Sequence, residues 1–545
     1  MRKKAVVLLA SFMIAGGGIS FGQSDTTTSM RYTIYGDYKP KLSSANKVIT
    51  KPEVAPIKST PPKFDYDLPN FAYSVLPTYH PAKAISIKSE LDKPLTGNYF
   101  KLGAGNYLTP YAEFRVHSTR NKNFNYGAYG SHLSSNAGNP ANADFSDNHL
   151  GVMGSKIGKK GELTGKLNYE RHVVHFYGYD DSLEFDKRNI NQIFNDFNGF
   201  AEYDRGYGSK KMGSKSKFSF YTFATHGNRR ENDFEGSIKT LFKMPQKTQL
   251  AVNASLDYTN LIEDAQNILN RTFVRIEPSY SFMYKKIKVD AGLNTVVVID
   301  SNGGGFKLFP NIGAEHYLVP KKVLAFARID GEVKKNSLRQ LSYLNPFVAN
   351  DILLENTTNS FNVGGGLKGV LAKKIDYLLK VRFSVDNNLP LFLTDSTPTR
   401  QFSVVYDDVQ TVAFQTGLGF RLDERFFIQF ATTLYNYKTD IQAQAWQLPS
   451  FDADVNMRYT LAKKLNLRLQ LYAYGERFQQ DEFDASKPVK KLSPFMDINV
   501  SADYRYKKNI SFFLNANNIS NSRYQKWYAY PSFGLNLLAG ITFSL

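Results

Sequence analysis

Alternation of apolar and polar residues at every second position is the feature that most constrains this chain. Between Lys463 and Tyr474 the sequence reads KKLNLRLQLYAY, and the same alternation recurs at 374–386, 496–506 and 535–545. Because successive side chains of a strand point to opposite faces, each run predicts a strand with one apolar face. Each run is about 10–12 residues long, the length of a tilted strand that crosses a bilayer, whereas strands of globular proteins have about five or six residues.

The N-terminus has the pattern of a secretory signal peptide. Three basic residues at positions 2–4 precede an apolar run at 5–14, and small residues follow up to Gly22. This predicts cleavage near Gly22, so that residues 1–22 are removed from the exported protein. The chain has no cysteine, which excludes disulfides, thiolate chemistry and a lipid anchor on cysteine. Beyond the signal peptide no apolar run is long enough for a membrane helix.

Composition favours a large folded protein. The chain has 545 residues, of which 42% are hydrophobic and 14% aromatic, and this argues against disorder. Its net charge of +19 could indicate nucleic acid as a partner, but export separates the protein from nucleic acid. Much of the positive charge lies in lysine pairs at predicted turns, where it either contacts lipid phosphates or is simply solvated.

Short turns divide the chain into hairpins. The ten predicted turns lie around Asn121, Lys159, Lys210, Gln246, Lys285, Lys321, Lys373, Asp423, Lys463 and Lys507. The longer polar loops between them are predicted at Ser134–Asp144, Tyr179–Asn191, Gln340–Asn359, Asn387–Arg400, Thr439–Ser450 and Phe478–Leu492. Ten turns separate eleven hairpins, the first at Tyr99–Thr119, and so predict about 22 strands, within a range of 20–22.

The predicted fold class is therefore all-β, a transmembrane antiparallel β-barrel over residues 97–545. A closed barrel satisfies every backbone hydrogen bond without water, which an exported chain without a spanning helix requires in a membrane. Only every second side chain would face lipid, which agrees with the low average hydrophobicity. Residues 23–96 hold nine of the chain's 22 prolines, and this density predicts an extended segment before the barrel.

The final segment, FFLNANNISNSRYQKWYAYPSFGLNLLAGITFSL, resembles the end of a TonB-dependent receptor barrel. The residues that match the family's motif are Asn517, Asn518, Asn521, Tyr524, Tyr530, Pro531 and Gly534. The apolar positions of the alternating last strand are Leu535, Leu537, Ala539, Ile541, Phe543 and Leu545. The resemblance implies that the barrel-assembly machinery recognises this strand. The sequence departs from the family at Leu535, where an arginine is usual, and at its end, where two residues follow the aromatic Phe543.

The resemblance covers the barrel only and is of the type found in Bacteroidetes outer membranes. A full receptor carries a plug domain of well over a hundred residues, and no such domain or TonB box is recognisable in the 74 residues of 23–96. A barrel of this strand number encloses a lumen that known transporters fill. Three solutions stay open: residues 23–96 enter the lumen, long loops fold inward, or another protein occludes it. Residues 23–96 are otherwise a flexible linker or a docking arm for a periplasmic or outer-membrane partner.

No catalytic, cofactor-binding or metal-binding residues are predicted. His172 and His175 lie three residues apart, which places them on opposite faces of a strand, so they do not share a metal ion. Glycine-rich stretches at 301–306 and 363–369 lack the lysine and following helix of a phosphate loop. The polar residues otherwise form no constellation typical of an enzyme.

The leading hypothesis is a non-enzymatic Gram-negative outer-membrane barrel of TonB-dependent-receptor type for solute passage or uptake. Its expected surroundings are outer-membrane lipid and lipopolysaccharide, with the barrel-assembly machinery during insertion. The alternative is a structural or assembly barrel of an envelope or secretion complex that recruits partners through residues 23–96.

Overall fold

The structure is a computed structural model that describes residues 98–545, apart from 119–120, 122, 137–139, 181, 209–210, 228, 264–267, 301–302, 373, 396 and 481–488. The predicted signal peptide and the proline-rich segment lie outside the described residues.

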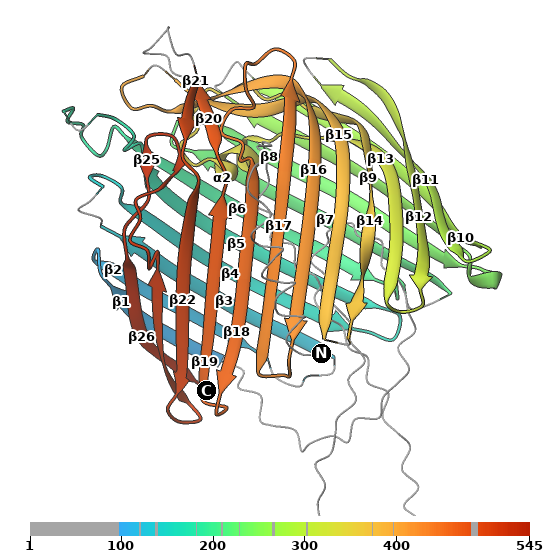
Figure 1. The fold of residues 1–545 in the computed structure, drawn as a ribbon, viewed down its shortest axis with the longest axis horizontal. Coiled ribbons are helices and arrows are strands. Elements are labelled where there is room, and N and C mark those ends of the chain that lie inside the picture. The colour runs from blue at the N-terminus through green and yellow to red at the C-terminus, as the bar shows by residue number, and fades with distance from the viewer. Residues whose placement is uncertain are drawn as a thin grey trace, which may run out of the picture. The chain divides into compact units, whose positions relative to one another are not determined.

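Twenty-two strands form one antiparallel sheet in which each strand pairs with the next along the chain and the last, β26, pairs with the first, β1, so the sheet closes into a barrel (Figure 1). The predicted fold class is confirmed. The barrel strands are β1 (Asn98–Gly105), β2 (Thr109–His117), β3 (Phe124–Ser135), β4 (Phe145–Ile157), β5 (Glu162–His175), β6 (Asn191–Asp204), β7 (Met212–Thr225), β8 (Arg230–Lys243), β9 (Gln249–Ile262), β10 (Ile268–Tyr284), β11 (Ile287–Asp300), β12 (Gly305–Val319), β13 (Val323–Lys334), β14 (Thr357–Leu371), β15 (Ile375–Thr394), β16 (Phe402–Arg421), β17 (Phe426–Thr439), β18 (Phe451–Leu461), β19 (Leu465–Tyr474), β22 (Phe495–Arg505), β23 (Ile510–Asn517) and β26 (Asn536–Ser544).

The other elements lie in the connections between these strands. They are a 3-10 helix (Pro245–Lys247), the helix α2 (Leu338–Leu344), a hairpin of β20 (Arg477–Gln480) with β21 (Val489–Leu492), and the short pair β24 (Gln525–Trp527) and β25 (Tyr530–Pro531). No helix among the described residues is long and apolar enough to cross a membrane.

Side chains alternate between an apolar outer face and a polar inner face. In β19, Leu469 pairs with Met457 and Val500 on its two neighbours, whereas Gln470 pairs with Asn456 and Asn499. The alternation in the sequence is thus a two-faced barrel wall.

The last strand closes the barrel by pairing with both β23 and β1. Four of the residues predicted for it, Leu537, Ala539, Ile541 and Phe543, lie within β26, and Leu535 and Leu545 flank it. Gly540 lies on the opposite face, where an added Cβ would be 2.0 Å from the Leu102 carbonyl oxygen, so only glycine fits at this seam.

The predicted turns around Asn121, Lys159, Gln246, Lys285, Lys321, Asp423, Lys463 and Lys507 connect barrel strands, and the first hairpin, β1–β2, begins at Asn98, one residue before its predicted range. The predicted turns around Lys210 and Lys373 fall on residues outside the described part of the chain, between β6 and β7 and between β14 and β15. The loop predicted at Asn387–Arg400 starts too early, because β15 continues to Thr394 before the chain turns to β16, which begins at Phe402. A bulge at Asn388, where φ is 55°, shifts the register between Asp386 and Leu389 and lets the strand continue past a polar stretch that looks like a turn.

Candidate functional site

The connection between β13 and β14, residues 335–356, folds as a loop that we call the lumen loop. It contains α2, which begins after Ser337, whose side chain accepts a hydrogen bond from the Gln340 backbone N–H as an N-cap. Leu338 and Leu341, three residues apart, are almost fully buried on one face of the helix. The helix therefore forms because a cap and an apolar face coincide.

A buried ion pair on the inner wall holds the start of α2. The Glu231 carboxylate of β8 accepts hydrogen bonds from the backbone N–H groups of Leu338, at 2.8 Å, and Arg339, at 3.3 Å. Arg271 of β10 lies 3.7 Å from Glu231 and donates to the Asn336 carbonyl oxygen at 2.8 Å. Both charged side chains are 0% exposed. Removing either partner would leave a buried charge uncompensated, which costs about 3–5 kcal/mol.

Lys335, the first residue of the lumen loop, lies among side chains of β8 and β9. Its ammonium group donates to the carboxylates of Asp233 and Asp257, the second at 2.7 Å, and to the Thr259 hydroxyl at 2.9 Å. The three wall side chains face the lumen from the adjacent strands β8 and β9, and all four side chains are largely buried. The loop thus leaves β13 under a second charged restraint.

A third restraint joins α2 to β5 and β6. The Arg339 guanidinium donates to Asp196 at 2.7 Å, and the Tyr343 hydroxyl lies 2.9 Å from the same carboxylate and 3.3 Å from Glu170. Burial and these two carboxylates raise the pKa of Tyr343 well above its usual value, so the hydroxyl stays protonated and donates.

Hydrogen bonds to its backbone groups hold the second half of the lumen loop. The Gln192 amide of β6 donates to the Val348 carbonyl oxygen at 3.2 Å. The Ala349 N–H donates to the Phe402 carbonyl at 2.8 Å, and the Phe402 N–H donates to the Phe347 carbonyl at 2.9 Å, which forms a short parallel bridge to β16. One stretch of loop therefore contacts β6 on one side and β16 on the other.

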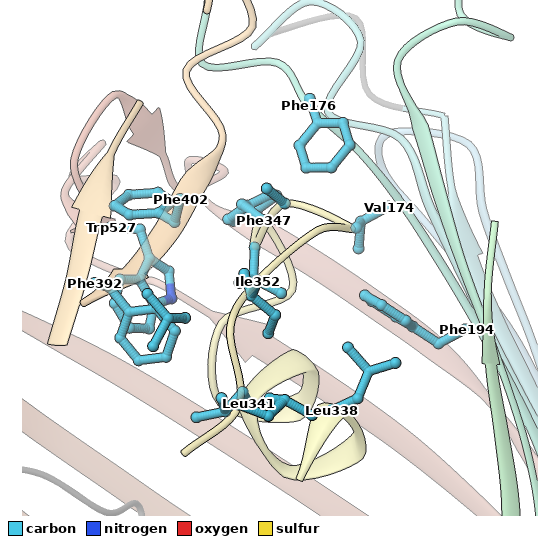
Figure 2. Close-up of a cluster of buried hydrophobic side chains, with 14 of the residues drawn as sticks. Val174, Phe176, Phe194, Leu338, Leu341, Phe347, Ile352, Phe392, Phe402 and Trp527 are labelled. Carbon is cyan, nitrogen blue, oxygen red and sulfur yellow. The ribbon is translucent and has the colours of Figure 1, made fainter. Parts of the chain in front are cut away.

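An apolar cluster extends this contact (Figure 2). On one wall the cluster includes Val174, Phe194, Phe223 and Leu261 of β5, β6, β7 and β9. The lumen loop contributes Leu338, Leu341, Phe347 and Ile352. The remaining members are Phe392 of β15, Phe402 of β16, and Trp527 and Tyr530 near the C-terminus. In a ring of 22 strands, β6 and β16 are ten strands apart and so lie on opposite sides. The lumen loop therefore crosses the barrel interior from wall to wall.

Most of the motif residues near the C-terminus lie in the connection between β23 and β26, where asparagine side chains bind the backbone. The Asn518 amide donates to the carbonyl oxygens of Ser522, at 2.6 Å, and Phe533, at 2.7 Å. The Asn521 side-chain oxygen accepts from the Leu535 N–H at 2.8 Å, and a Cβ on Gly534 would lie 2.3 Å from this oxygen. Asparagines at positive φ and a glycine at the closest approach explain the residue types of the motif.

The other motif residues reach toward the lumen loop. Tyr530 stacks on Phe347 with ring centroids 3.7 Å apart, and Pro531 accepts a hydrogen bond from the Tyr177 hydroxyl at 3.1 Å. Tyr524 stacks on Phe495 at 4.1 Å and donates to Asp497. Asn517 ends β23 and donates to Asn536. The structure thus brings part of the motif, above all Tyr530, against the loop that crosses the lumen.

Comparison with known proteins shows which solved structures have a similar fold. No family model and no curated protein matches the chain. Solved structures match over most of the barrel, among them the pyoverdine outer membrane receptor FpvA from Pseudomonas aeruginosa PAO1 bound to pyoverdine, with a TM-score of 0.62 at 12% identity over 83% of this chain and 79% of that one. The fold is that of a TonB-dependent receptor barrel. The FrpB iron transporter from Neisseria meningitidis has a TM-score of 0.64 at 10% identity, over 82% of this chain and 81% of that one. The ferric-catecholate import receptor Fiu from E. coli K12 has a TM-score of 0.61 at 9% identity, over 83% and 82%.

The histidines of this receptor-like barrel contact their neighbours separately. His172 faces the lumen, where its Nδ1 contacts Asp147 and its ring stacks on Phe194 at 6.0 Å. His175, on the other face, places Nδ1 2.9 Å from the Asp144 carbonyl oxygen. Among the described residues no group of three or more histidine and acidic side chains is arranged to hold a metal ion.

The sequence did not identify the lumen loop as part of the site. The predicted loop at Gln340–Asn359 contains most of it, but its partners Glu231 and Arg271 look like ordinary polar residues of the inner face. The one local signal was the stretch NSLRQLSYL, in which a serine precedes leucines at helical spacing.

Proposed function

We propose that this receptor-like barrel spans the outer membrane of a Gram-negative bacterium and takes up a solute through its lumen, with the lumen loop as an internal gate. The observation that carries the proposal is the loop itself, which crosses a closed barrel from wall to wall. The fold supports it, since structures with the same architecture include a pyoverdine receptor and a ferric-catecholate import receptor.

The outer surface supports the same location. Large apolar side chains such as Leu150, Leu256 and Leu308 are about half exposed on the outer face of β4, β9 and β12, where lipid would cover them. Export by the signal peptide, contact with lipopolysaccharide, a Bacteroidetes-type origin and a partner for residues 23–96 belong to the same proposal.

The restraints of the lumen loop define how the gate works. Buried charged groups are held strongly by their protein partners, because no other hydrogen-bonding group is within reach. Once water enters the site, water molecules can take the place of those partners. A polar solute that enters between the loop and the wall supplies such alternatives. The gate therefore stays closed while the site excludes water. It opens when the loop exchanges its hydrogen-bonding partners on the wall for those of the solute, and no strand has to unfold.

Replacing residues 337–354 by a short glycine–serine linker tests the gate. We expect the single-channel conductance in planar bilayers to rise severalfold, because the wall-to-wall contact is lost while all 22 strands remain. A shift in mobility between boiled and unboiled samples on a denaturing gel shows that the variant barrel is folded. Equal conductance of the two proteins contradicts a gating loop, and absence of current from both favours a sealed scaffold.

The proposed location in a membrane is tested by a matched pair in β19. Leu469→Arg puts a charge on the outer face, and we expect it to destabilise the barrel in lipid vesicles, lowering the free energy of unfolding by about 2–4 kcal/mol. Gln470→Arg puts the same charge on the inner face and is expected to leave this free energy almost unchanged. Equal effects of the two substitutions, measured by urea titration in vesicles, contradict a lipid-facing outer surface.

A further inference from the structure

A pocket of about 310 Å³ lies on the inner wall of β2–β5 and meets the lumen loop only at Glu170, among the described contacts given above. Its lining includes two registered rows of inward-facing residues. Ser131, His149 and Glu170 pair across β3, β4 and β5, and Tyr129 and Asn168 flank Gly151 in the next row. The pocket is thus part of the lumen surface that a passing solute meets.

Tyr129, which lines this pocket, is fixed in position by the glycine beside it. A Cβ on Gly151 would lie 2.3 Å from the Tyr129 Cζ atom, so the ring occupies the space of an absent side chain. The Tyr129 hydroxyl donates to the Asn168 side-chain oxygen, and the Asn168 amide donates to Asn198 at 2.8 Å. The ring therefore forms a rigid platform.

Two cations approach this platform without a carboxylate partner. The guanidinium carbon of Arg115 lies 5.8 Å from the Tyr129 ring centroid, and the ammonium nitrogen of Lys166 lies 5.1 Å from it. Within the described part of the chain neither forms an ion pair, whereas Lys215 on β7 pairs with both Glu202 and Asp204. Arg115 is exposed to the lumen and Lys166 is half-buried, so both are accessible to a solute.

The carboxylates of the pocket already have donors. Glu113 accepts hydrogen bonds from the hydroxyls of Tyr99 and Tyr111, the second at 2.6 Å. Glu170 accepts from Tyr343 of the lumen loop at 3.3 Å and lies 3.7 Å from His149. The acceptors of the pocket are thus engaged by the protein, while its two strongest donors, Arg115 and Lys166, are not.

We propose that this pocket binds an oxyanion, a carboxylate or phosphate group, through Arg115 and Lys166 on either side of the Tyr129 platform. The anion site adds a class of solute to the proposed uptake function. It rests on that function only in treating the bound anion as a transported solute. Guanidinium and ammonium groups are the donors best suited to such oxygens, and partial enclosure strengthens their attraction. Through Glu170 and Tyr343 the pocket also adjoins the lumen loop.

The test is equilibrium dialysis of the purified full-length protein in detergent at low salt, with labelled inorganic phosphate and labelled citrate as probes. We expect saturable binding of at least one probe, weakened about tenfold or more by Arg115→Gln with Lys166→Gln, since both charge-assisted hydrogen bonds to the anion are lost. Lys217→Gln is the matched control, because Lys217 lies over the Phe200 ring at 5.3 Å, outside the pocket, and its loss should leave the affinity unchanged.

A second variant keeps both cations and removes the platform. Gly151→Ala forces Tyr129 out of its position, and we expect it to weaken binding of the same probe in a barrel that stays folded on a denaturing gel. Binding of phosphate alone assigns the site to phosphate, and binding of citrate alone assigns it to organic carboxylates. No saturable binding to the wild-type protein, or equal binding by the double variant, overturns the proposal. Because dialysis needs no transport, a barrel that binds the probe but passes no current refutes uptake and retains the site.

Discussion

Glu231→Ala should release the lumen loop from the barrel wall and expose it to protease. The substitution removes the acceptor for the N–H groups of Leu338 and Arg339 and leaves Arg271 buried without its carboxylate. Breaking such a pair costs about 3–5 kcal/mol, which is enough to populate a detached loop at equilibrium. Trypsin should then cleave the folded barrel after Lys335 or Arg339, whereas the wild-type protein resists cleavage there; mass spectrometry of the fragments measures this.

Glu235→Ala is the matched control for this experiment. Glu235 lies four residues further along β8 on the same inner face, but among the described residues it accepts only a long hydrogen bond, of 3.4 Å, from Ser219, and none from the loop. Its loss should leave the loop protected. Cleavage at equal rates in the two variants would show that the buried carboxylate does not hold α2, and the gate would then need another restraint.

The strands and turns of this barrel could be predicted from sequence because they depend on local patterns. Period-two alternation gives the wall, and lysine pairs or polar residues mark the short turns. The predicted loop from Asn387 starts too early, because the bulge at Asn388 uses the same residue types as a loop or turn.

The candidate site could not be predicted in the same way, because its contacts join distant parts of the chain. Glu231 and Leu338 are separated by 107 positions, and Gln192 and Val348 by 156. Inward-facing charges are expected in any polar lumen, so sequence alone does not distinguish those that anchor a loop from those that face water. The C-terminal motif was recognisable, but its contact through Tyr530 with the lumen loop was not.

A disulfide between the lumen loop and the wall should lock the gate. An ideal Cβ on Gly227, in the β7–β8 connection, lies 3.0 Å from the Asn350 Cβ, and a disulfide needs about 3.5–4.5 Å, so a shift of about half an ångström suffices. The chain contains no other cysteine to compete. Gly227→Cys with Asn350→Cys, when oxidised, should stabilise the closed loop by about 2–4 kcal/mol and lower its open probability about thirtyfold or more. Single-channel recording before and after a reductant measures the change.

The two single-cysteine variants separate the lock from the substitutions themselves. Asn350→Cys removes the hydrogen bond of 3.2 Å from the Gln192 amide, which by itself should loosen the loop slightly and raise the open probability. The disulfide must therefore lower the open probability although Asn350→Cys alone raises it. The reductant should return the double variant to the open probability of the Asn350→Cys single variant. Equal currents in the oxidised and reduced states would mean that the loop does not move during conduction, and the lumen loop would then be a fixed constriction.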